Sequence, residues 1–285
     1  MKTIDHVNTT YAHEEEQIDF YATINADGTP HITMLTSLHI YDEDTFLWGE
    51  YSAGQSKRNQ QVRTKVGFLS LIDRHTGAFG QADWTAAEKS GEKLDALNQI
   101  PEYRYNNVNG YMPAHILKKK CFEQKELNLD ALQHAKAETA AALSQVEPGN
   151  VPQAISILTR QYFAADQGFK TLAYVGSDGY PVVLPVPQAQ LTSANRVVFS
   201  MDQDSDLLKI PEGQPVAIYA IEFPSMCSVL VNGVLKVTQV NGKPVGMVDV
   251  ERVYNPMLPV AGQIYPPVPY EAVTKFEDTV YEYNV

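Results

Sequence analysis

The chain has 285 residues, of which 44% are apolar, 10% aromatic and 20% charged, and its formal net charge at pH 7 is −12. These values are typical of a globular protein rather than a disordered chain, and the length allows two domains of ordinary size. The acidic balance argues against binding of nucleic acid, because neutralising phosphates needs clustered Lys and Arg, and the only basic run is Lys118-Lys119-Lys120, which we interpret as a solvated strand end.

The N-terminal residues 1–17 contain the Glu14-Glu15-Glu16 run, which a secretory signal or a membrane helix would not carry. We therefore expect a cytoplasmic protein that does not bind a membrane. Cys121 and Cys227 lie in no cluster with metal-ligand spacing, so we expect no metal site and interpret both as buried residues.

The first half of the chain is predicted to be mostly β-strand. Asp27-Gly28 supplies the positive φ that a tight hairpin needs. Runs rich in β-branched and aromatic residues predict strands, the last of them weakly, at 20–24, 31–40, 45–50, 66–72 and 78–84.

Two helical patterns follow these strands. Residues 85–99 place apolar side chains near helical spacing and end just before Pro101. Residues 129–145 are rich in Ala and other strong helix formers. The breaker Glu147-Pro148-Gly149-Asn150 then predicts a domain boundary, which divides the chain into residues 1–148 and 149–285.

The second half repeats the order of elements of the first. The nine residues Ala22-Thr-Ile-Asn-Ala-Asp-Gly-Thr-Pro30 recur 151 positions later as Ala173-Tyr-Val-Gly-Ser-Asp-Gly-Tyr-Pro181. The proline-rich last thirty residues predict an extended surface arm. A helix is predicted at 151–165, and strands, the last with a bend at Asn232-Gly233, at 171–175, 182–191, 196–201, 215–223 and 228–240.

Antiparallel strands joined by short turns indicate a mainly β fold, a barrel or a sandwich, in each half. The segment Gly49-Glu-Tyr-Ser-Ala-Gly-Gln-Ser-Lys-Arg-Asn-Gln-Gln-Val-Arg-Thr-Lys-Val-Gly-Phe-Leu-Ser-Leu71 resembles the stretch that holds the phosphate in FMN-binding split barrels of the pyridoxamine 5′-phosphate oxidase family. With the preceding hairpin, the resemblance covers residues 18–73 well and 170–223 weakly. It implies two tandem split β-barrel modules with connecting helices, and FMN as the cofactor.

The residues Ser56, Lys57, Arg58 and Asn59 offer a hydroxyl, two cations and an amide in consecutive positions, which suits a phosphomonoester. Read without the repeat, they are an exposed turn with ordinary surface charges. By analogy with the family, the strand segment Thr33, Met34, Leu35 and Thr36 lies along the isoalloxazine ring, and Gly49 ends the strand before the phosphate loop. On a strand, alternate side chains face opposite sides, so only Thr33 and Leu35, or only Met34 and Thr36, can face the flavin, and the sequence does not say which. An ordinary barrel strand with no flavin beside it also stays open.

The second half has an acidic loop at 202–209 in place of the cationic cluster, and like charges would repel a phosphate there. We therefore expect one flavin site per chain, with the second module completing a pseudo-dimer within the chain; a homodimer also stays open. Gln188 or Tyr219 from the second module could approach the flavin.

The resemblance to FMN-binding split barrels implies an FMN-binding oxidoreductase or flavin-reductase-like protein that acts with an unknown small-molecule substrate or electron donor. No side chain is identified as an obligatory acid, base or nucleophile, so the catalytic residues stay unknown. The alternatives are a non-catalytic flavin- or haem-binding or sensing module, and a structural double barrel with a vestigial site. The acidic C-terminal residues disfavour oxidation of pyridoxamine phosphate itself.

Overall fold

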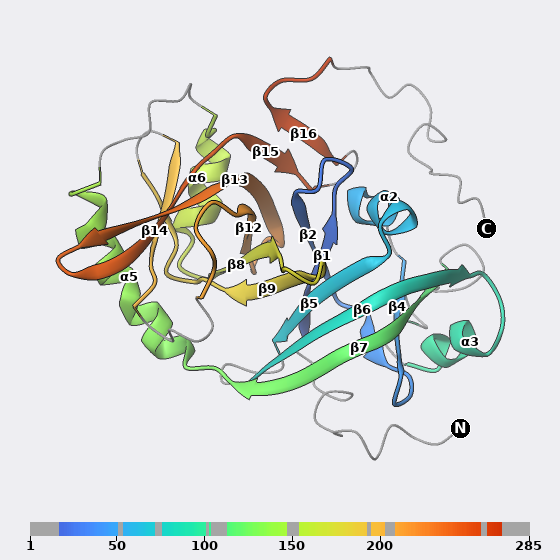
Figure 1. Ribbon diagram of the computed structural model, residues 1–285. Helices are drawn as coiled ribbons and strands as arrows, with labels where there is room; N and C mark the ends of the chain where they lie inside the picture. Colours follow the sequence, from blue (N-terminus) through green and yellow to red (C-terminus); the bar gives the residue numbers. More distant parts are fainter. Residues whose placement is uncertain are drawn as a thin grey trace.

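The structure is a computed structural model and describes residues 17–50, 54–71, 76–100, 103, 113–146, 154–192, 195–202, 209–257 and 261–269. Within these residues the fold is mainly β, with two antiparallel sheets beside one another and helices at their margins (Figure 1). The predicted class is confirmed: the chain forms two tandem split β-barrel modules with connecting helices.

The first module begins with the hairpin of β1 and β2 and places α2 between β4 and β5. Its described elements are β1 (Ile18–Ile24), β2 (Pro30–Leu35), β3 (Leu38–Ile40), β4 (Thr45–Gly49), α2 (Gln55–Val62), β5 (Lys65–Leu71), β6 (Thr76–Glu88), α3 (Glu92–Asn98) and β7 (Ala114–Glu126).

Two helices lead from the first module into the second, and a pair of short strands ends the described chain. These elements are α5 (Leu129–Leu143), α6 (Ile157–Ala164), β8 (Gly168–Val175), β9 (Pro181–Pro185), β10 (Gln190–Leu191), β11 (Arg196–Ser200), β12 (Pro215–Glu222), β13 (Cys227–Val240), β14 (Lys243–Asp249), β15 (Arg252–Asn255) and β16 (Gly262–Tyr265).

The two sheets have the same strand order. The first runs β2-β1-β5-β6-β7-β4-β3, and the second, taken in the matching direction, runs β9-β8-β12-β13-β14-β11-β10. Both open with the predicted hairpin, in which Gly28 has φ of +86° and Gly179 has φ of +81°. In each turn the preceding aspartate, Asp27 or Asp178, accepts a hydrogen bond from the backbone N–H two residues later.

The predicted helix at 85–99 is wrong over its first part. Residues up to Glu88 continue β6, which pairs with β7 as far as Glu88 opposite Ala114. The helix α3 begins only after Gly91, whose φ is +109°. Pairing with β7, a strand that the sequence did not predict, outweighs the weak helix preference of this short run.

Several other boundaries differ from the prediction. The run 31–40 is two strands separated by Thr36 and Ser37, and the run 182–191 is likewise divided after Pro185. The helix α6 starts later than predicted because Ser156 caps it, accepting from the Thr159 N–H at 3.1 Å. Residues 151–153 lie outside the described residues.

Further differences concern the surface of the chain. The basic run Lys118-Lys119-Lys120 lies inside β7 rather than at a strand end. The prediction of buried cysteines was wrong, because Cys121 is exposed on β7 and Cys227 is half-buried. The predicted C-terminal arm contains β16, which pairs with β15, and residues 258–260 and 270–285 lie outside the described residues.

The strand β13 turns the corner of the second barrel near the predicted bend. Its residues up to Val234 pair with β12, and those from Leu235 pair with β14. A Cβ atom at Gly233 would lie 2.0 Å from the Asp249 carbonyl oxygen, so the corner needs a glycine there.

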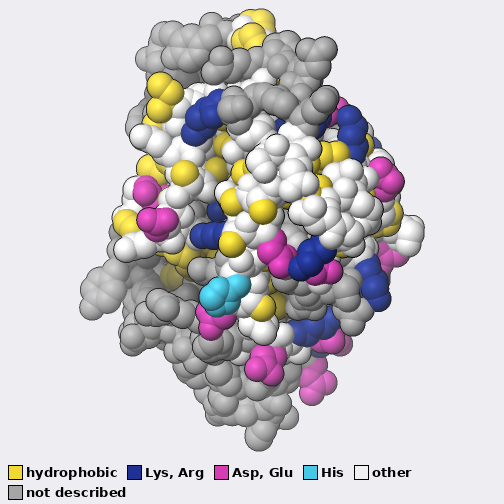
Figure 2. Space-filling view, turned by 90° about the vertical axis from the view of Figure 1, so that its left-hand side faces the viewer, with side chains coloured by type: hydrophobic (Ala, Val, Ile, Leu, Met, Phe, Trp, Pro, Cys, Tyr) yellow, Lys and Arg dark blue, Asp and Glu magenta, His cyan; other side chains and the backbone are white. Residues whose placement is uncertain are grey.

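The visible surface carries charges of both signs. Lys243 forms ion pairs with Glu138 (2.8 Å) and Asp202 (3.1 Å). On the face shown in Figure 2, basic and acidic side chains are mixed.

In the described part of the chain, no helix combines the length and apolar character needed to cross a membrane.

The two modules pack against each other through an apolar core that both contribute to. Phe20 stacks on Phe169 with 5.6 Å between ring centroids and meets Tyr219 edge-on at 6.1 Å. Strands β5 and β12 are mostly apolar because alternate residues face this shared core and most of the residues between them face each module's own core. The residues of these two strands in the shared core are Leu69, Leu71, Ala217, Tyr219 and Ile221.

The polar contacts between the modules are reciprocal. From the first module, the Gln81 side chain donates to the carbonyl of Pro181 at 3.3 Å. From the second, the Asn232 side chain donates to the carbonyl of Pro30 at 2.9 Å. Pro30 and Pro181 occupy the same position of the repeated hairpin, so each hairpin is held by the central strand, β6 or β13, of the other module.

The hairpin turns are held in the same reciprocal way. Asp27 pairs with Arg252 of the second module at 2.7 Å, and Asp178 pairs with Lys120 of the first. Each turn aspartate therefore meets a cation of the other module. These ion pairs are partly exposed, so we expect each to contribute little stability and chiefly to orient the hairpins.

Asp19 on β1 predicts how stability depends on pH. This carboxyl is fully buried, accepts hydrogen bonds from Gln17, Ser70 and the Leu38 N–H, and burial raises its pKa to about 7. Between about pH 4 and pH 7 the folded state binds a proton that the unfolded state has lost, so this group's contribution to stability falls as pH rises.

We expect the free energy of unfolding of Asp19→Asn, relative to wild type, to increase by up to about 1.4 kcal/mol for each pH unit in this window. Urea unfolding of both proteins at several pH values measures the difference between their free energies of unfolding. The contributions of the buried histidines are the same in both proteins and cancel in this difference. The same substitution at an exposed position, Asp44→Asn, serves as the control for loss of one carboxylate. A difference for Asp19→Asn that does not change with pH would contradict the argument.

Candidate functional site

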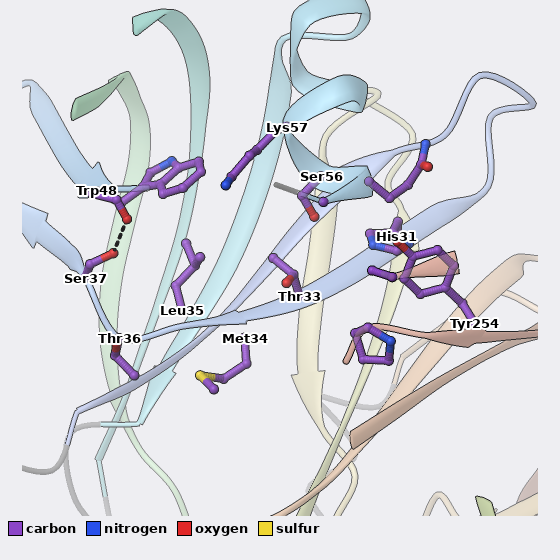
Figure 3. Close-up of a pocket in the computed structure, with 15 residues that line it drawn as sticks. His31, Thr33, Met34, Leu35, Thr36, Ser37, Trp48, Ser56, Lys57 and Tyr254 are labelled. Carbon is purple, nitrogen blue, oxygen red and sulfur yellow. Dashed lines mark hydrogen bonds between the residues drawn. The ribbon is translucent and has the colours of Figure 1, made fainter. Parts of the chain in front are cut away.

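A cavity of about 390 Å³ lies where β2, the end of β4 and the start of α2 meet the second module (Figure 3). Of the predicted site residues, all but Asn59 line it: Thr33, Met34, Leu35, Thr36, Gly49, Ser56 and Lys57. The other lining residues are His31, Ser37, Trp48, Gly54, Gln55, Tyr254, Pro256 and Ala261.

The second module contributes to the cavity, but through residues that the sequence did not indicate. The second module lines the cavity with Tyr254 of β15, Pro256 and Ala261. Gln188 and Tyr219 are not among the lining residues. The expectation about the acidic loop at 202–209 stays a prediction, because residues 203–208 lie outside the described residues.

Residues from both alternating sets of β2 line the cavity. Figure 3 shows Thr33 and Leu35 on the side of β2 that faces α2, with Met34 on the other side. The strand ends at Leu35, and the Ser37 hydroxyl then donates to the Gly49 carbonyl at 2.9 Å, which ties the break after β2 to the end of β4. The cavity therefore spans the end of the strand and meets both sets.

The N-terminus of α2 opens toward this cavity without a capping side chain. The residue before the helix is Gly54, and no side chain caps the first turn. The Ser56 hydroxyl is 95% buried (5% exposed) and has no hydrogen-bond partner among the described residues. A helix start with uncapped N–H groups and a buried hydroxyl that lacks an acceptor is suited to bind an anion.

Lys57 brings a cation to the same wall. Its side chain is almost fully buried, its ammonium lies 3.0 Å from the Glu50 carboxylate and 6.0 Å from the centre of the Trp48 ring. Burial lowers the pKa of Lys57 to about 8, while Glu50 acts in the opposite direction. A phosphate in the cavity would therefore share this cation with Glu50.

A buried network holds Glu50 in place. Its second oxygen lies 2.9 Å from Nε2 of His115, and Nδ1 of His115 lies 3.0 Å from the Trp84 indole nitrogen and 2.8 Å from the Gln60 amide nitrogen. The indole can only donate, so Nδ1 of His115 accepts. The proton of the ring is therefore on Nε2, which donates a hydrogen bond to Glu50. Burial lowers the pKa of His115, which agrees with a neutral ring.

His115 lies 65 positions from Glu50 in the chain, on β7, and stacks on Trp48 with 3.8 Å between ring centroids. The sequence carried no signal for this residue, because the pairing of β4 with β7 brings it to the site.

Asn59 is not among the residues that line this cavity, and its role in binding the cofactor stays a prediction. Its amide donates to Thr23 (3.0 Å) and Asn25 (2.9 Å), and its carbonyl oxygen accepts from Gln55 at 2.8 Å. These contacts tie α2 to the β1–β2 hairpin. In this structure Asn59 therefore supports the helix beside the cavity and does not line it.

Comparison with known proteins finds fold neighbours only. No protein-family model and no curated protein sequence matches the chain. A structure of HupZ from Group A Streptococcus is 21% identical, covers 37% of this chain and 82% of its own, and has a TM-score of 0.32. An FMN-binding protein from Syntrophomonas wolfei is 14% identical, with 38% and 77% covered and a TM-score of 0.32. A FAD-binding protein from Mesorhizobium loti is 7% identical, with 40% and 86% covered and a TM-score of 0.32.

Proposed function

We propose that this chain is an FMN-binding protein of the oxidoreductase or flavin-reductase type, with the cofactor in the cavity between β2, α2 and the second module. The observation that carries the proposal is the uncapped start of α2, where the buried hydroxyl of Ser56 and the ammonium of Lys57 face one cavity. These groups suit the phosphate of FMN.

The remaining wall suits a flat ring system. Trp48 and Tyr254 supply aromatic surface, and Leu35 and Met34 supply apolar surface. A bound flavin would accept electrons and pass them on, while the protein binds and orients the reactants. No side chain on this wall is assigned as an acid or base for that chemistry.

We also propose that residues 1–148 and 149–285 form two modules that imitate within one chain the two-fold pair of a split-barrel dimer. The reciprocal contacts of Gln81 with Pro181 and of Asn232 with Pro30 support this arrangement. The flavin site then depends on both modules, because Tyr254 comes from the second.

The proposal predicts that the protein binds FMN at least tenfold more tightly than riboflavin, which has the same ring system and no phosphate. A charge-assisted hydrogen bond to the phosphate contributes about 1.5–3 kcal/mol. Titration of the full chain with each compound, followed by flavin fluorescence, measures the two dissociation constants.

Equal affinities for FMN and riboflavin would contradict the phosphate site. Tight binding of haemin in place of either flavin would instead support the alternative of a haem-binding module. Oxidation of NADH or NADPH by the FMN-loaded protein is the measurement that separates an oxidoreductase from a non-catalytic flavin-binding module.

A further inference from the structure

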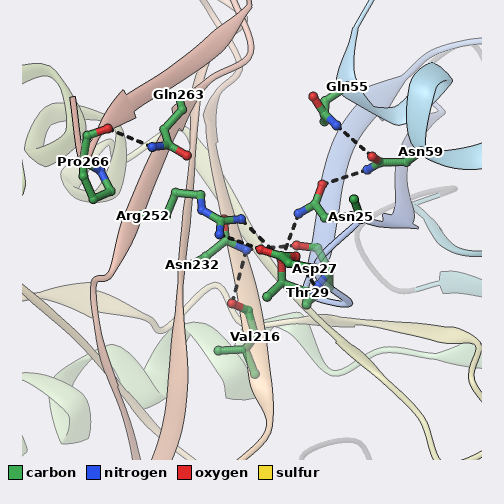
Figure 4. Close-up of polar contacts among 12 residues, drawn as sticks. Asn25, Asp27, Thr29, Gln55, Asn59, Val216, Asn232, Arg252, Gln263 and Pro266 are labelled. Carbon is green, nitrogen blue, oxygen red and sulfur yellow. Dashed lines mark hydrogen bonds and ion pairs between the residues drawn. The ribbon is translucent and has the colours of Figure 1, made fainter. Parts of the chain in front are cut away.

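A second cavity, of about 350 Å³, adjoins the first and shares His31, Gln55 and Tyr254 with it. Its walls come from both modules. The β1–β2 turn and α2 form one side, and β13, β15 and β16 form the other (Figure 4). A ligand in the first cavity could therefore extend into the second past His31.

Two arginines give this second cavity its charge. Arg252 donates to Asp27 at 2.7 Å and to the Thr29 hydroxyl at 3.4 Å, and Arg58 donates to the Gln55 side chain at 2.8 Å. A guanidinium carries five N–H donors, so Asp27 and Thr29 leave part of the Arg252 fork without an acceptor among the described residues. The lining residues Arg58, Arg252 and Asp27 sum to one positive charge in a chain whose net charge is −12.

His31 lines both cavities, and the charges of the two arginines affect its pKa. Its ring is 96% buried (4% exposed) and meets the Tyr254 ring edge-on at 4.8 Å. Burial, and then the charges of Arg58 and Arg252, lower the pKa of His31 to about 3. The imidazole is therefore neutral near pH 7, and both cations act on the space beside it.

We propose that this second cavity binds an oxyanion, the phosphate or carboxylate group of a ligand whose body lies in the first cavity. The planar fork of a guanidinium matches both groups, and two arginines from different modules enclose the space. The proposal goes beyond the flavin site and rests on the proposed function only in placing the FMN phosphate beside Ser56 and Lys57. FMN has one phosphate, so the anion here belongs either to a second reactant or to a dinucleotide that carries a further phosphate.

The first measurement titrates the full chain, without flavin, with inorganic phosphate and with acetate at constant ionic strength. The readout is the ring resonances of His31 in nuclear magnetic resonance spectra, assigned with His31→Gln. We expect at least one of the two anions to shift them saturably. Resonances that move with neither anion would overturn the proposal.

Two variants that break the same ion pair then separate anion binding from a structural role. Arg252→Met should weaken binding of that anion at least tenfold, whereas Asp27→Asn should strengthen it at least threefold, because it removes the competing carboxylate. If the pair only ties the modules together, both variants lose stability alike and neither changes the anion affinity. That result would overturn the proposal, as would an anion that binds only beside Ser56.

Arg58→Met provides a third variant if Arg252→Met does not fold, and it should also weaken anion binding at least tenfold. A comparison of FAD with FMN identifies the source of the anion: tighter binding of FAD that Arg252→Met removes points to a dinucleotide, and equal binding points to a second reactant. Ser56 and Lys57 are unchanged in Arg252→Met, so failure of the anion proposal in that variant leaves the preference for FMN over riboflavin intact.

Discussion

Replacing Gly67 with alanine is expected to lower the free energy of unfolding by about 3 kcal/mol and to weaken FMN binding at the same time. Gly67 lies in β5, where a Cβ atom would be 2.1 Å from the carbonyl oxygen of Pro181 and 2.8 Å from its carbonyl carbon. Both atoms belong to the backbone of the second module, so no side-chain rotation relieves the overlap. The modules must separate or β5 must shift.

Urea unfolding of the full chain measures the first effect, and an FMN titration of the folded variant measures the second. Gly262→Ala is the matched control, because among the described residues no atom outside its two chain neighbours lies within 4 Å of its added Cβ; its stability should stay within about 0.5 kcal/mol of wild type. A Gly67→Ala protein with wild-type stability would contradict the close packing of β5 against β9. A destabilised variant with wild-type FMN affinity would show that the cofactor site needs only the first module.

Replacing Lys57 with methionine is expected to weaken FMN binding by about 1.5–3 kcal/mol, which is roughly a tenfold to hundredfold loss, and to leave riboflavin binding nearly unchanged. Methionine keeps much of the buried stem and removes the ammonium that faces the cavity. Because burial lowers the pKa of Lys57 to about 8, the preference of the wild type for FMN should also decline above that pH as the ammonium loses its proton. Calorimetric or fluorescence titration with both flavins measures these effects.

Glu50→Gln tests the same phosphate site and should have the opposite effect on FMN binding. Glu50 lies 3.0 Å from the Lys57 ammonium, so its carboxylate competes with a phosphate for that cation. Removing the negative charge should raise the preference for FMN over riboflavin. Lys243→Met is the control for net charge, because Lys243 lies in β14 of the second module, pairs with Glu138 and Asp202, and does not line the cavity. If Lys243→Met lowers FMN affinity as much as Lys57→Met, the effect is one of overall charge, and Lys57 does not hold the phosphate.

Local turn chemistry and the apolar runs of several strands were determined by the sequence itself. Asp27-Gly28 and Asp178-Gly179 form hairpin turns because a glycine with positive φ and an aspartate that accepts from the backbone are properties of adjacent residues. The apolar runs that became β5 and β12 were recognisable for the same reason. The polar residues Ser56 and Lys57, between two predicted strands, were enough to indicate one wall of the candidate site.

Contacts between distant residues were decided only by the tertiary structure. The contact of Glu50 with His115, and the positions of Arg252 and Tyr254 in the cavity walls, depend on which strands pair and how the modules pack. Likewise, Thr85–Glu88 could be seen as part of β6 only once β7 was present beside it. Sequence periodicity reports which face of an element is buried, but not which partner buries it, because that choice is made by the packing of the whole chain.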